Sequence, residues 1–159
     1  MSGHAYAPEP MIGLADYATD HSRKSMRWIP KRFPFLARWV GPLGDRGEKI
    51  ALDFLKQAGF RIIQTNYVCP IGEIDIIAAD GDVLVFVEVK TRRSDVENDP
   101  EESVNWHKRR KLTQVARHFI AHKNAHNMTA RFDVVAIVMP ESGKPVITHF
   151  VEAFAPTPR

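Results

Sequence analysis

The fold is decided by two apolar segments in the middle of the chain, Gly72-Glu-Ile-Asp-Ile-Ile-Ala-Ala79 and Val83-Leu-Val-Phe-Val-Glu-Val-Lys90. Both are rich in β-branched residues, which favour strands. The Asp80-Gly81-Asp82 segment between them is typical of a tight hairpin turn. The sequence therefore predicts an antiparallel hairpin at the centre of the chain.

Alternation along these strands divides their side chains between two faces of the hairpin. On the first strand, one face is expected to hold Ile74, Ile76 and Ala78, and the other Glu73, Asp75 and Ile77. On the second strand, the four valines share one face, and the other holds Leu84, Phe86, Glu88 and Lys90. A two-residue turn allows two registers, in which Asp75 lies directly opposite Glu88 or diagonal to it. Both registers bring Asp75, Glu88 and Lys90 together.

This charged group is unusual among apolar neighbours. Two carboxylates about 5 Å apart on a sheet repel each other, and burial increases that cost. A salt bridge from Lys90 would offset part of the repulsion, and a divalent cation would offset it more fully. Mg²⁺ takes one or two protein carboxylates together with waters and substrate phosphate. The pattern favours a site for Mg²⁺ or Mn²⁺ with Asp75, Glu88 and Lys90 as catalytic residues, in which Lys90 orients or deprotonates water or stabilises charge on phosphorus.

The rest of the chain supplies further regular elements. Helical spacing of apolar residues predicts a helix from residue 45 that stops at Gly59, followed by a strand over 60–68. A second amphipathic helix is expected from near Ser103, its N-cap, to near Lys123. Two more strands are predicted over 131–139 and 145–151. The element order is αβββαββ, an α/β fold with a mixed sheet flanked by helices.

Length and composition limit the class of protein. The 159 residues, 44% of them hydrophobic, suit one ordinary domain. No apolar run approaches the roughly 18–20 residues of a membrane span, and no signal peptide is recognisable, so a cytoplasmic protein without integral membrane association is expected. The single cysteine, Cys69, excludes an internal disulfide. We expect a flexible, basic and aromatic arm over 1–43, a domain over 44–154 and a C-terminal tail over 155–159.

Charge is distributed in blocks along the chain. The net charge is +3, and residues 95–102 hold five acids, whereas residues 103–132 hold seven Lys or Arg and no acid. A basic block of this kind is typical of a surface that binds a polyanion, although a solvated helix face gives the same pattern. The residues expected to contact nucleic-acid phosphates are Arg92, Arg93, Lys108, Arg109, Arg110, Lys111 and Arg117. Trp106, near the helix start, is expected to pack against the sheet edge or, as the alternative, to stack on a base.

Several segments together resemble a known family. Asp75 followed by Glu88-Val-Lys90 is similar to the D…(D/E)xK signature of the PD-(D/E)xK nuclease superfamily. Residues 44–154 resemble the YraN-like family of small, largely uncharacterised bacterial proteins. The segments that carry this resemblance are Gly44-Asp-Arg-Gly-Glu48, Gly59-Phe-Arg-Ile62, Asn66-Tyr67, Gly72-Glu-Ile-Asp-Ile-Ile-Ala78, Phe86-Val-Glu-Val-Lys-Thr-Arg-Arg93, Arg109-Arg-Lys-Leu112, Arg131-Phe-Asp-Val-Val-Ala-Ile137 and 149–154.

The resemblance implies a restriction-endonuclease-like fold of the Holliday-junction-resolvase type, and with it a homodimer. It also directs attention to Glu48, because an acidic residue on the first helix of such nucleases often joins the metal site. The alternative role for Glu48 is to complement the helix dipole. The expected metal ligands are Glu48, Asp75, Glu88 and the backbone carbonyl of Val89.

Three functions remain open on the sequence. The first is a metal-dependent nuclease that hydrolyses DNA phosphodiester bonds, the second a non-catalytic nucleic-acid-binding module, and the third a protein-interaction adaptor with the same fold. The clustered acids favour the first over the second, because a binding module has no use for them. The acid-free stretch over 103–132 favours either of these over the third.

Overall fold

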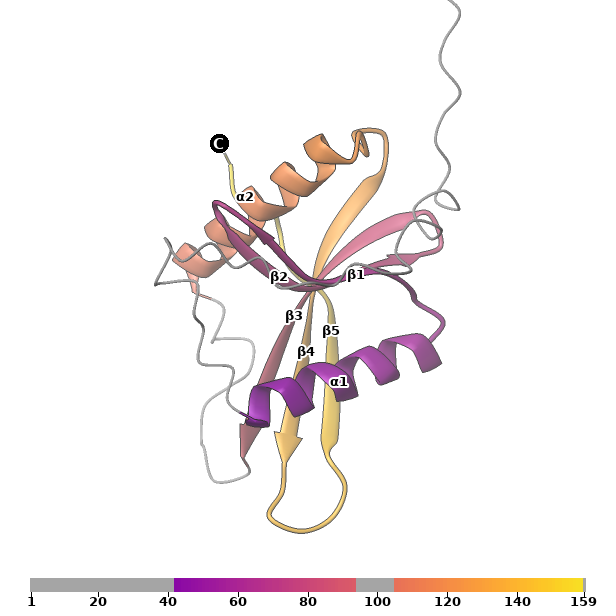
Figure 1. The fold of residues 1–159 in the computed structure, drawn as a ribbon, viewed down its shortest axis with the longest axis vertical. Coiled ribbons are helices and arrows are strands. Elements are labelled where there is room, and N and C mark those ends of the chain that lie inside the picture. The colour runs from indigo at the N-terminus through magenta and orange to yellow at the C-terminus, as the bar shows by residue number, and fades with distance from the viewer. Residues whose placement is uncertain (1–41, 94–104, 159) are drawn as a thin grey trace, which may run out of the picture.

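The computed structural model describes residues 42–93 and 105–158, which form a five-stranded sheet with two helices (Figure 1). The predicted order αβββαββ and the α/β class are confirmed. The predicted arm (apart from its last two residues), the acidic segment 95–102 and Ser103 lie outside the described residues. The elements are α1 (Pro42–Gln57), β1 (Arg61–Cys69), β2 (Gly72–Asp80), β3 (Val83–Arg93), α2 (Trp106–His122), β4 (Thr129–Met139) and β5 (Val146–Phe154).

Helix α1 ends as its sequence predicts. Gly59 has a φ of 92°, a left-handed conformation that glycine adopts without a Cβ penalty. The N–H groups of Gly59 and Phe60 donate to the carbonyls of Lys56 and Leu55, at 3.1 and 3.0 Å. These two bonds form a Schellman motif, which satisfies the last carbonyls of the helix and turns the chain into β1.

The sheet has the strand order β1-β2-β3-β4-β5. All neighbouring pairs are antiparallel except β3 and β4, which are parallel. A parallel pair needs a long crossover connection, and α2 lies in the connection between β3 and β4. This topology places α2 beside β3, which carries Glu88 and Lys90.

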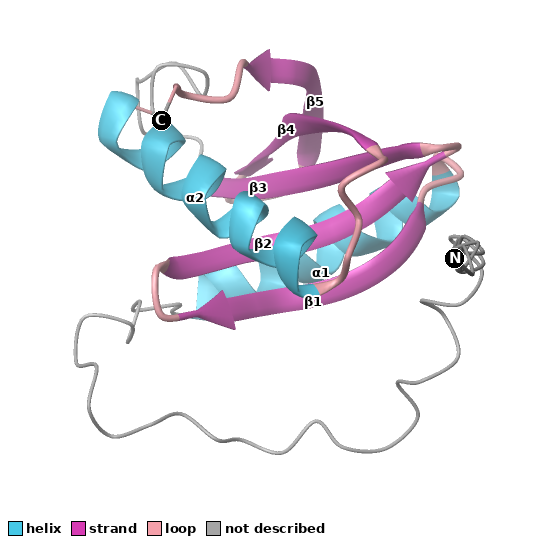
Figure 2. Ribbon diagram, turned by 90° about the horizontal axis from the view of Figure 1, so that it is seen from above, coloured by secondary structure: helices cyan, strands magenta, loops and turns pink. Residues whose placement is uncertain are grey.

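The two helices cover opposite faces of the sheet (Figure 2). Ala51 and Leu55 of α1 pack on one face with Ile76, Val85 and Val87. The core of the other face includes four residues of α2, namely Leu112, Val115, Ala116 and Phe119, packed with Leu84 and Phe86. The predicted separation of the β3 valines from Leu84 and Phe86 is confirmed.

The central hairpin has the predicted two-residue turn. Asp80 pairs with Val83, Gly81 has a φ of 57°, and Ile76 pairs with Val87. Extended by one residue, this register would place Asp75 opposite Glu88, but the pairing of β2 with β3 ends at Ile76 and Val87.

The predicted face of Ile74 is wrong. Ile74 packs under α2 with Tyr67, whereas Ile76 packs under α1. Tyr67 is the β1 partner of Ile74, and the neighbouring Asn66 has a φ of 51°. The left-handed residue interrupts the alternation in β1, and the paired β2 changes face with it. Asp75 lies at this change of face.

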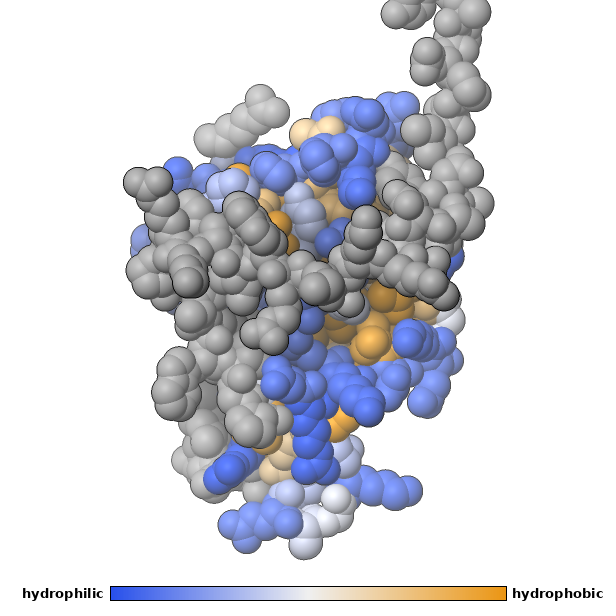
Figure 3. Space-filling model, in the orientation of Figure 1, coloured by the Kyte–Doolittle hydropathy of each residue, from blue (hydrophilic) through white to orange (hydrophobic). Residues whose placement is uncertain are grey.

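Helix α2 begins at Trp106 and is capped by Asn105, whose Oδ1 accepts the N–H of Lys108 at 3.0 Å. Hydrophilic side chains cover much of the visible surface around the two helices (Figure 3), and hydrophobic surface shows between α1 and the β1–β2 ribbon. Ile50, Phe54 and Ile62 are among the partly buried hydrophobic residues of the α1 layer. Neither described helix is long and apolar enough to cross a bilayer.

Candidate active site

Asp75 is held at the point where β2 separates from β3. The last pair between these strands is Ile76 with Val87. Beyond it, the backbone N–H of Val89 donates to Asp75 Oδ2 at 2.8 Å, and the carboxylate is 4% exposed. The Asp75 carboxylate therefore lies against the backbone segment that connects Glu88 to Lys90.

Glu88 is a buried carboxylate with incomplete hydrogen bonding. It is 2% exposed. Its Oε1 lies 2.9 Å from Lys90 Nζ and 3.1 Å from Lys108 Nζ. Neither Oε1 nor Oε2 accepts a directed hydrogen bond. Glu88 is thus partly neutralised by two ammonium groups, but its oxygens are not satisfied in the way that buried oxygens usually are.

Two glycines bring both helices close to this region. A Cβ at Gly72, the first residue of β2, would lie 2.7 Å from Lys111 Cε and 3.3 Å from Val115 Cγ2 of α2. A Cβ at Gly47 of α1 would overlap the side chain of Thr91, the residue after Lys90. These close approaches place the second and third turns of α2 and the second turn of α1 beside the strands that carry the acids.

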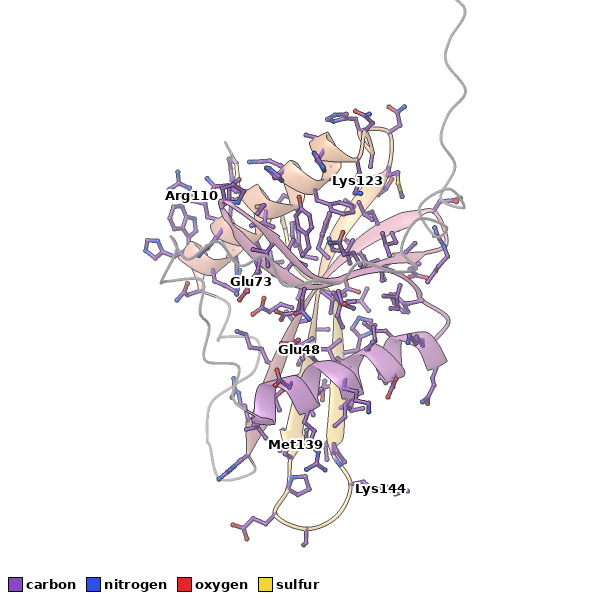
Figure 4. All side chains as sticks on the ribbon, viewed as in Figure 1. Glu48, Glu73, Arg110, Lys123, Met139 and Lys144 are labelled. Carbon is purple, nitrogen blue, oxygen red and sulfur yellow. The ribbon has the colours of Figure 1, made fainter. Side chains whose placement is uncertain are left out.

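Glu48 and Glu73 flank the two buried acids without completing a larger acidic cluster. In Figure 4, Glu73 lies on the α2 side of the strand crossing and Glu48 lies on α1 below it. Within residues 42–93 and 105–158, no group of three or more His, Cys, Asp or Glu is arranged to hold a metal. The role of Glu48 as a ligand therefore stays a prediction.

The residues present nevertheless suit a hard divalent cation. Two buried carboxylates, Asp75 and Glu88, lie on neighbouring strands, and both Glu88 oxygens lack a directed donor. Mg²⁺ needs only one or two carboxylates, because waters and a substrate phosphate complete its shell. Asp75 and Glu88, with the Val89 backbone between them and Lys90, are the groups that would hold such an ion.

Several of the cations predicted to contact phosphate instead contact other groups of the protein. Lys108 turns to Glu88, the Arg109 guanidinium lies 5.7 Å from the centre of the Phe154 ring, and Arg117 Nη2 donates to the carbonyl of Thr157 at 2.8 Å. Arg110 is exposed and lies 5.5 Å from the centre of the Trp106 ring. Lys111 runs past Gly72, and Arg92 and Arg93 end β3.

The expected packing of Trp106 is wrong. Its side chain is 57% exposed at the first residue of α2. The ring contacts its own helix, through Arg110 and through the His107 ring at 5.2 Å. An exposed indole of this kind is free for base stacking, the alternative role.

A second charged cluster, which the sequence analysis missed, lies on the face covered by α1. Asp133 of β4 is fully buried and accepts hydrogen bonds from Arg131 Nε at 3.0 Å, from His149 Nε2 at 2.9 Å and from the backbone N–H of Glu152 at 3.0 Å. Arg131 also contacts Asp80 at 2.9 Å. The spacing of Arg131 and Asp133 repeats the i, i+2 pattern of Glu88 and Lys90, and this was the available signal.

The geometry of this cluster explains its electrostatics. Burial opposes ionisation of Asp133, but the hydrogen bonds from His149, Arg131 and the Glu152 N–H outweigh it and lower the pKa of Asp133. The His149 ring packs edge-on against Phe54 and Phe60, at centroid distances of 5.9 and 5.6 Å. The cluster joins β4, β5 and α1 around a carboxylate whose two oxygens both accept hydrogen bonds. This arrangement indicates a structural role.

Comparison with known proteins places the candidate site in a family. The sequence model described as uncharacterised protein family UPF0102 matches residues 47–137. The chain belongs to this family. A UPF0102 protein of Alkaliphilus metalliredigens is 46% identical over 109 residues, which are 69% of this chain and 93% of the relative. UPF0102 proteins of Geotalea daltonii and Renibacterium salmoninarum are 46% and 42% identical, over 70% and 67% of this chain and 88% and 91% of theirs.

Membership in UPF0102 confirms the resemblance to the YraN-like family. The matched range contains both clusters up to Asp133, including Glu48, Asp75, Glu88 and Lys90. The family description names no activity. The function of the site therefore has to be argued from its own geometry.

Proposed function

We propose that this UPF0102 protein is a metal-dependent nuclease that binds DNA and hydrolyses phosphodiester bonds. The observation that carries the proposal is the buried pair Asp75 and Glu88, with the Glu88 oxygens unsatisfied and Lys90 in contact with one of them. A purely structural sheet would gain stability by replacing such a carboxylate with an apolar side chain. Retention of a poorly satisfied charge is typical of a site with a chemical task.

In this proposal the residues divide the work of hydrolysis. Asp75, Glu88 and the backbone carbonyl of Val89 would hold Mg²⁺ or Mn²⁺, and Glu48 would reach the ion directly or through water. When bound, the ion supplies Lewis-acid stabilisation of the phosphate and lowers the pKa of a water. Lys90, fixed beside Glu88 by its place on β3, positions the attacking water or stabilises the negative charge that develops at phosphorus.

DNA binding is assigned to the cations of α2, beside the acids. The cations of α2 lie on the same face of the sheet as Glu88, and Lys108 connects the helix to the acid directly. Such side chains bind phosphates without reading sequence. The proposal includes a cytoplasmic location and a homodimer, which would match the two-fold symmetry of a four-way junction.

A cleavage assay tests the proposal. Wild type is incubated with Mg²⁺ or Mn²⁺ and labelled duplex, single-stranded and four-way-junction DNA, beside Asp75→Ala and the control Asp53→Ala, whose side chain is exposed on α1. We expect cleavage by wild type and the control only. DNA binding without cleavage in every lane would replace the nuclease with the binding module, and neither binding nor cleavage would favour the adaptor.

A further inference from the structure

Lys108 reaches the acidic pair from helix α2, whereas the acids and Lys90 lie on strands β2 and β3. It lies in the first turn of α2, and its Nζ contacts the same Glu88 oxygen as Lys90 Nζ, at 3.1 against 2.9 Å. Two ammonium groups at one oxygen repel each other. Because neither gives Glu88 a directed hydrogen bond, the contacts neutralise charge without fixing a geometry.

Among the two acids and the two lysines around Glu88, the formal charges balance without a metal. Asp75 and Glu88 are matched by Lys90 and Lys108. A divalent cation added to this arrangement would introduce uncompensated positive charge next to two ammonium groups in a largely buried place, which is costly. The cost falls when one ammonium withdraws from Glu88.

Lys108 is the ammonium that can withdraw. Lys90 is two residues from Glu88 on the same strand, inside a sheet, so its reach away from the carboxylate is short. Both lysine side chains are partly exposed, Lys90 at 22% and Lys108 at 28%, but Lys108 lies on a separate helix, from which its flexible four-carbon stem can carry the ammonium away from Glu88 into solvent. There it would join the other cations of α2.

We infer that Lys108 is a displaceable counter-ion of Glu88. In the metal-free protein it neutralises the carboxylate, and binding of a divalent cation releases its ammonium to contact a DNA phosphate. The inference rests on the proposed function, which supplies the cation and the DNA. It gives Lys108 a role different from that of Arg110, because the phosphate contact of Lys108 depends on the cation.

Calorimetric titration with Mn²⁺ tests the displacement. Lys108→Met keeps most of the aliphatic stem and removes the competing charge, so Mn²⁺ affinity should rise about tenfold, the size of effect that one close charge has on a carboxylate. Lys144→Met, an identical change in the exposed turn between β4 and β5 (Figure 4), should match wild type. Circular dichroism of both variants controls for folding.

The second readout is DNA affinity with and without Mn²⁺, measured on a phosphorothioate DNA that resists cleavage. Lys108→Met should weaken binding with Mn²⁺ and leave it unchanged without Mn²⁺. If wild type binds Mn²⁺ and Lys108→Met binds it with equal affinity, the displacement is wrong while the proposed function stands. If Lys108→Met weakens DNA binding equally with and without Mn²⁺, Lys108 is an ordinary surface cation. If wild type binds no Mn²⁺, both proposals fail.

Discussion

Two carboxylates are buried in the same sheet and are held in opposite ways. Asp133, on the face of α1, accepts hydrogen bonds from Arg131, His149 and the backbone of Glu152. Glu88, on the face of α2, has two ammonium groups at one oxygen and no directed hydrogen bond at either. Both are almost completely buried, at 0% and 2% exposed. The two carboxylates are therefore similarly buried and differ in the groups that contact their oxygens.

The comparison distinguishes a carboxylate that stabilises the fold from one kept available for a ligand. A buried charge with a full set of donors recovers much of the cost of leaving water. A buried charge with poor partners does not, and proteins tolerate such groups where function requires them.

The largest effect is expected from Asp133→Ala. It removes the acceptor of the partly buried His149 and of the Glu152 N–H and leaves Arg131 only its contact with Asp80, so the free energy of unfolding should fall by about 3–5 kcal/mol. Urea unfolding at pH 7 measures it, with the exposed Asp53→Ala as the control. A loss below about 1 kcal/mol would show that the network is not structural.

Lys90→Ala should affect chemistry and not binding. Loss of one group that acts on the transition state lowers a cleavage rate by roughly 10²-fold or more. DNA affinity should be retained. Single-turnover cleavage and fluorescence anisotropy measure the two quantities.

Neutralising Lys108, Arg109 and Lys111 together should have the opposite effect to Lys90→Ala, because these side chains are assigned to DNA binding. DNA affinity should fall by a similar factor for all sequences, and the salt slope should fall by up to about 0.9 for each lost duplex phosphate contact. If Lys90→Ala abolishes binding and the triple variant does not, the roles are assigned wrongly.

The pH dependence of stability tests the Asp133 network. The folded-state pKa of Asp133 is lowered by its hydrogen bonds below the ordinary value of 3.8, despite the opposing effect of burial. Its stabilisation is therefore complete above that ordinary value and is lost as the pH falls through the folded pKa. The difference in unfolding free energy between wild type and Asp133→Asn should be largest near neutral pH and shrink in acid. A difference that stays constant down to full protonation would contradict this account.

The smallest effect on stability is expected from Glu88→Gln. The substitution removes a buried charge and its repulsion with Asp75, and it frees two lysines that already reach solvent. Unfolding free energy should be unchanged or rise by up to about 1 kcal/mol. A loss of several kcal/mol in urea unfolding, relative to the exposed Glu141→Gln, would show that the Glu88 group is a structural salt bridge.

The grouping of acids and lysine on the central hairpin could be predicted from the sequence, because period-two alternation and a two-residue turn are local properties. They left two registers open, and both group Asp75, Glu88 and Lys90; the structure has the register in which Ile76 pairs with Val87. The face of Ile74 was predicted wrongly, because the left-handed Asn66 lies in the other strand of the ribbon. The Lys108–Glu88 and His149–Asp133 contacts could not be predicted, because each needs a tertiary arrangement that spacing along the chain does not encode.

The most direct test of the central claim is a calorimetric titration of Mn²⁺ into wild type, Glu88→Ala and the exposed control Glu141→Ala. Wild type and the control should each show one weak site, and the site should be absent in Glu88→Ala, because it depends on a carboxylate whose Oε1 is shared by two ammonium groups and whose Oε2 accepts no hydrogen bond. Equal Mn²⁺ affinity in all three proteins would contradict the account, because the cation would then bind elsewhere and Glu88 would not be one of its ligands.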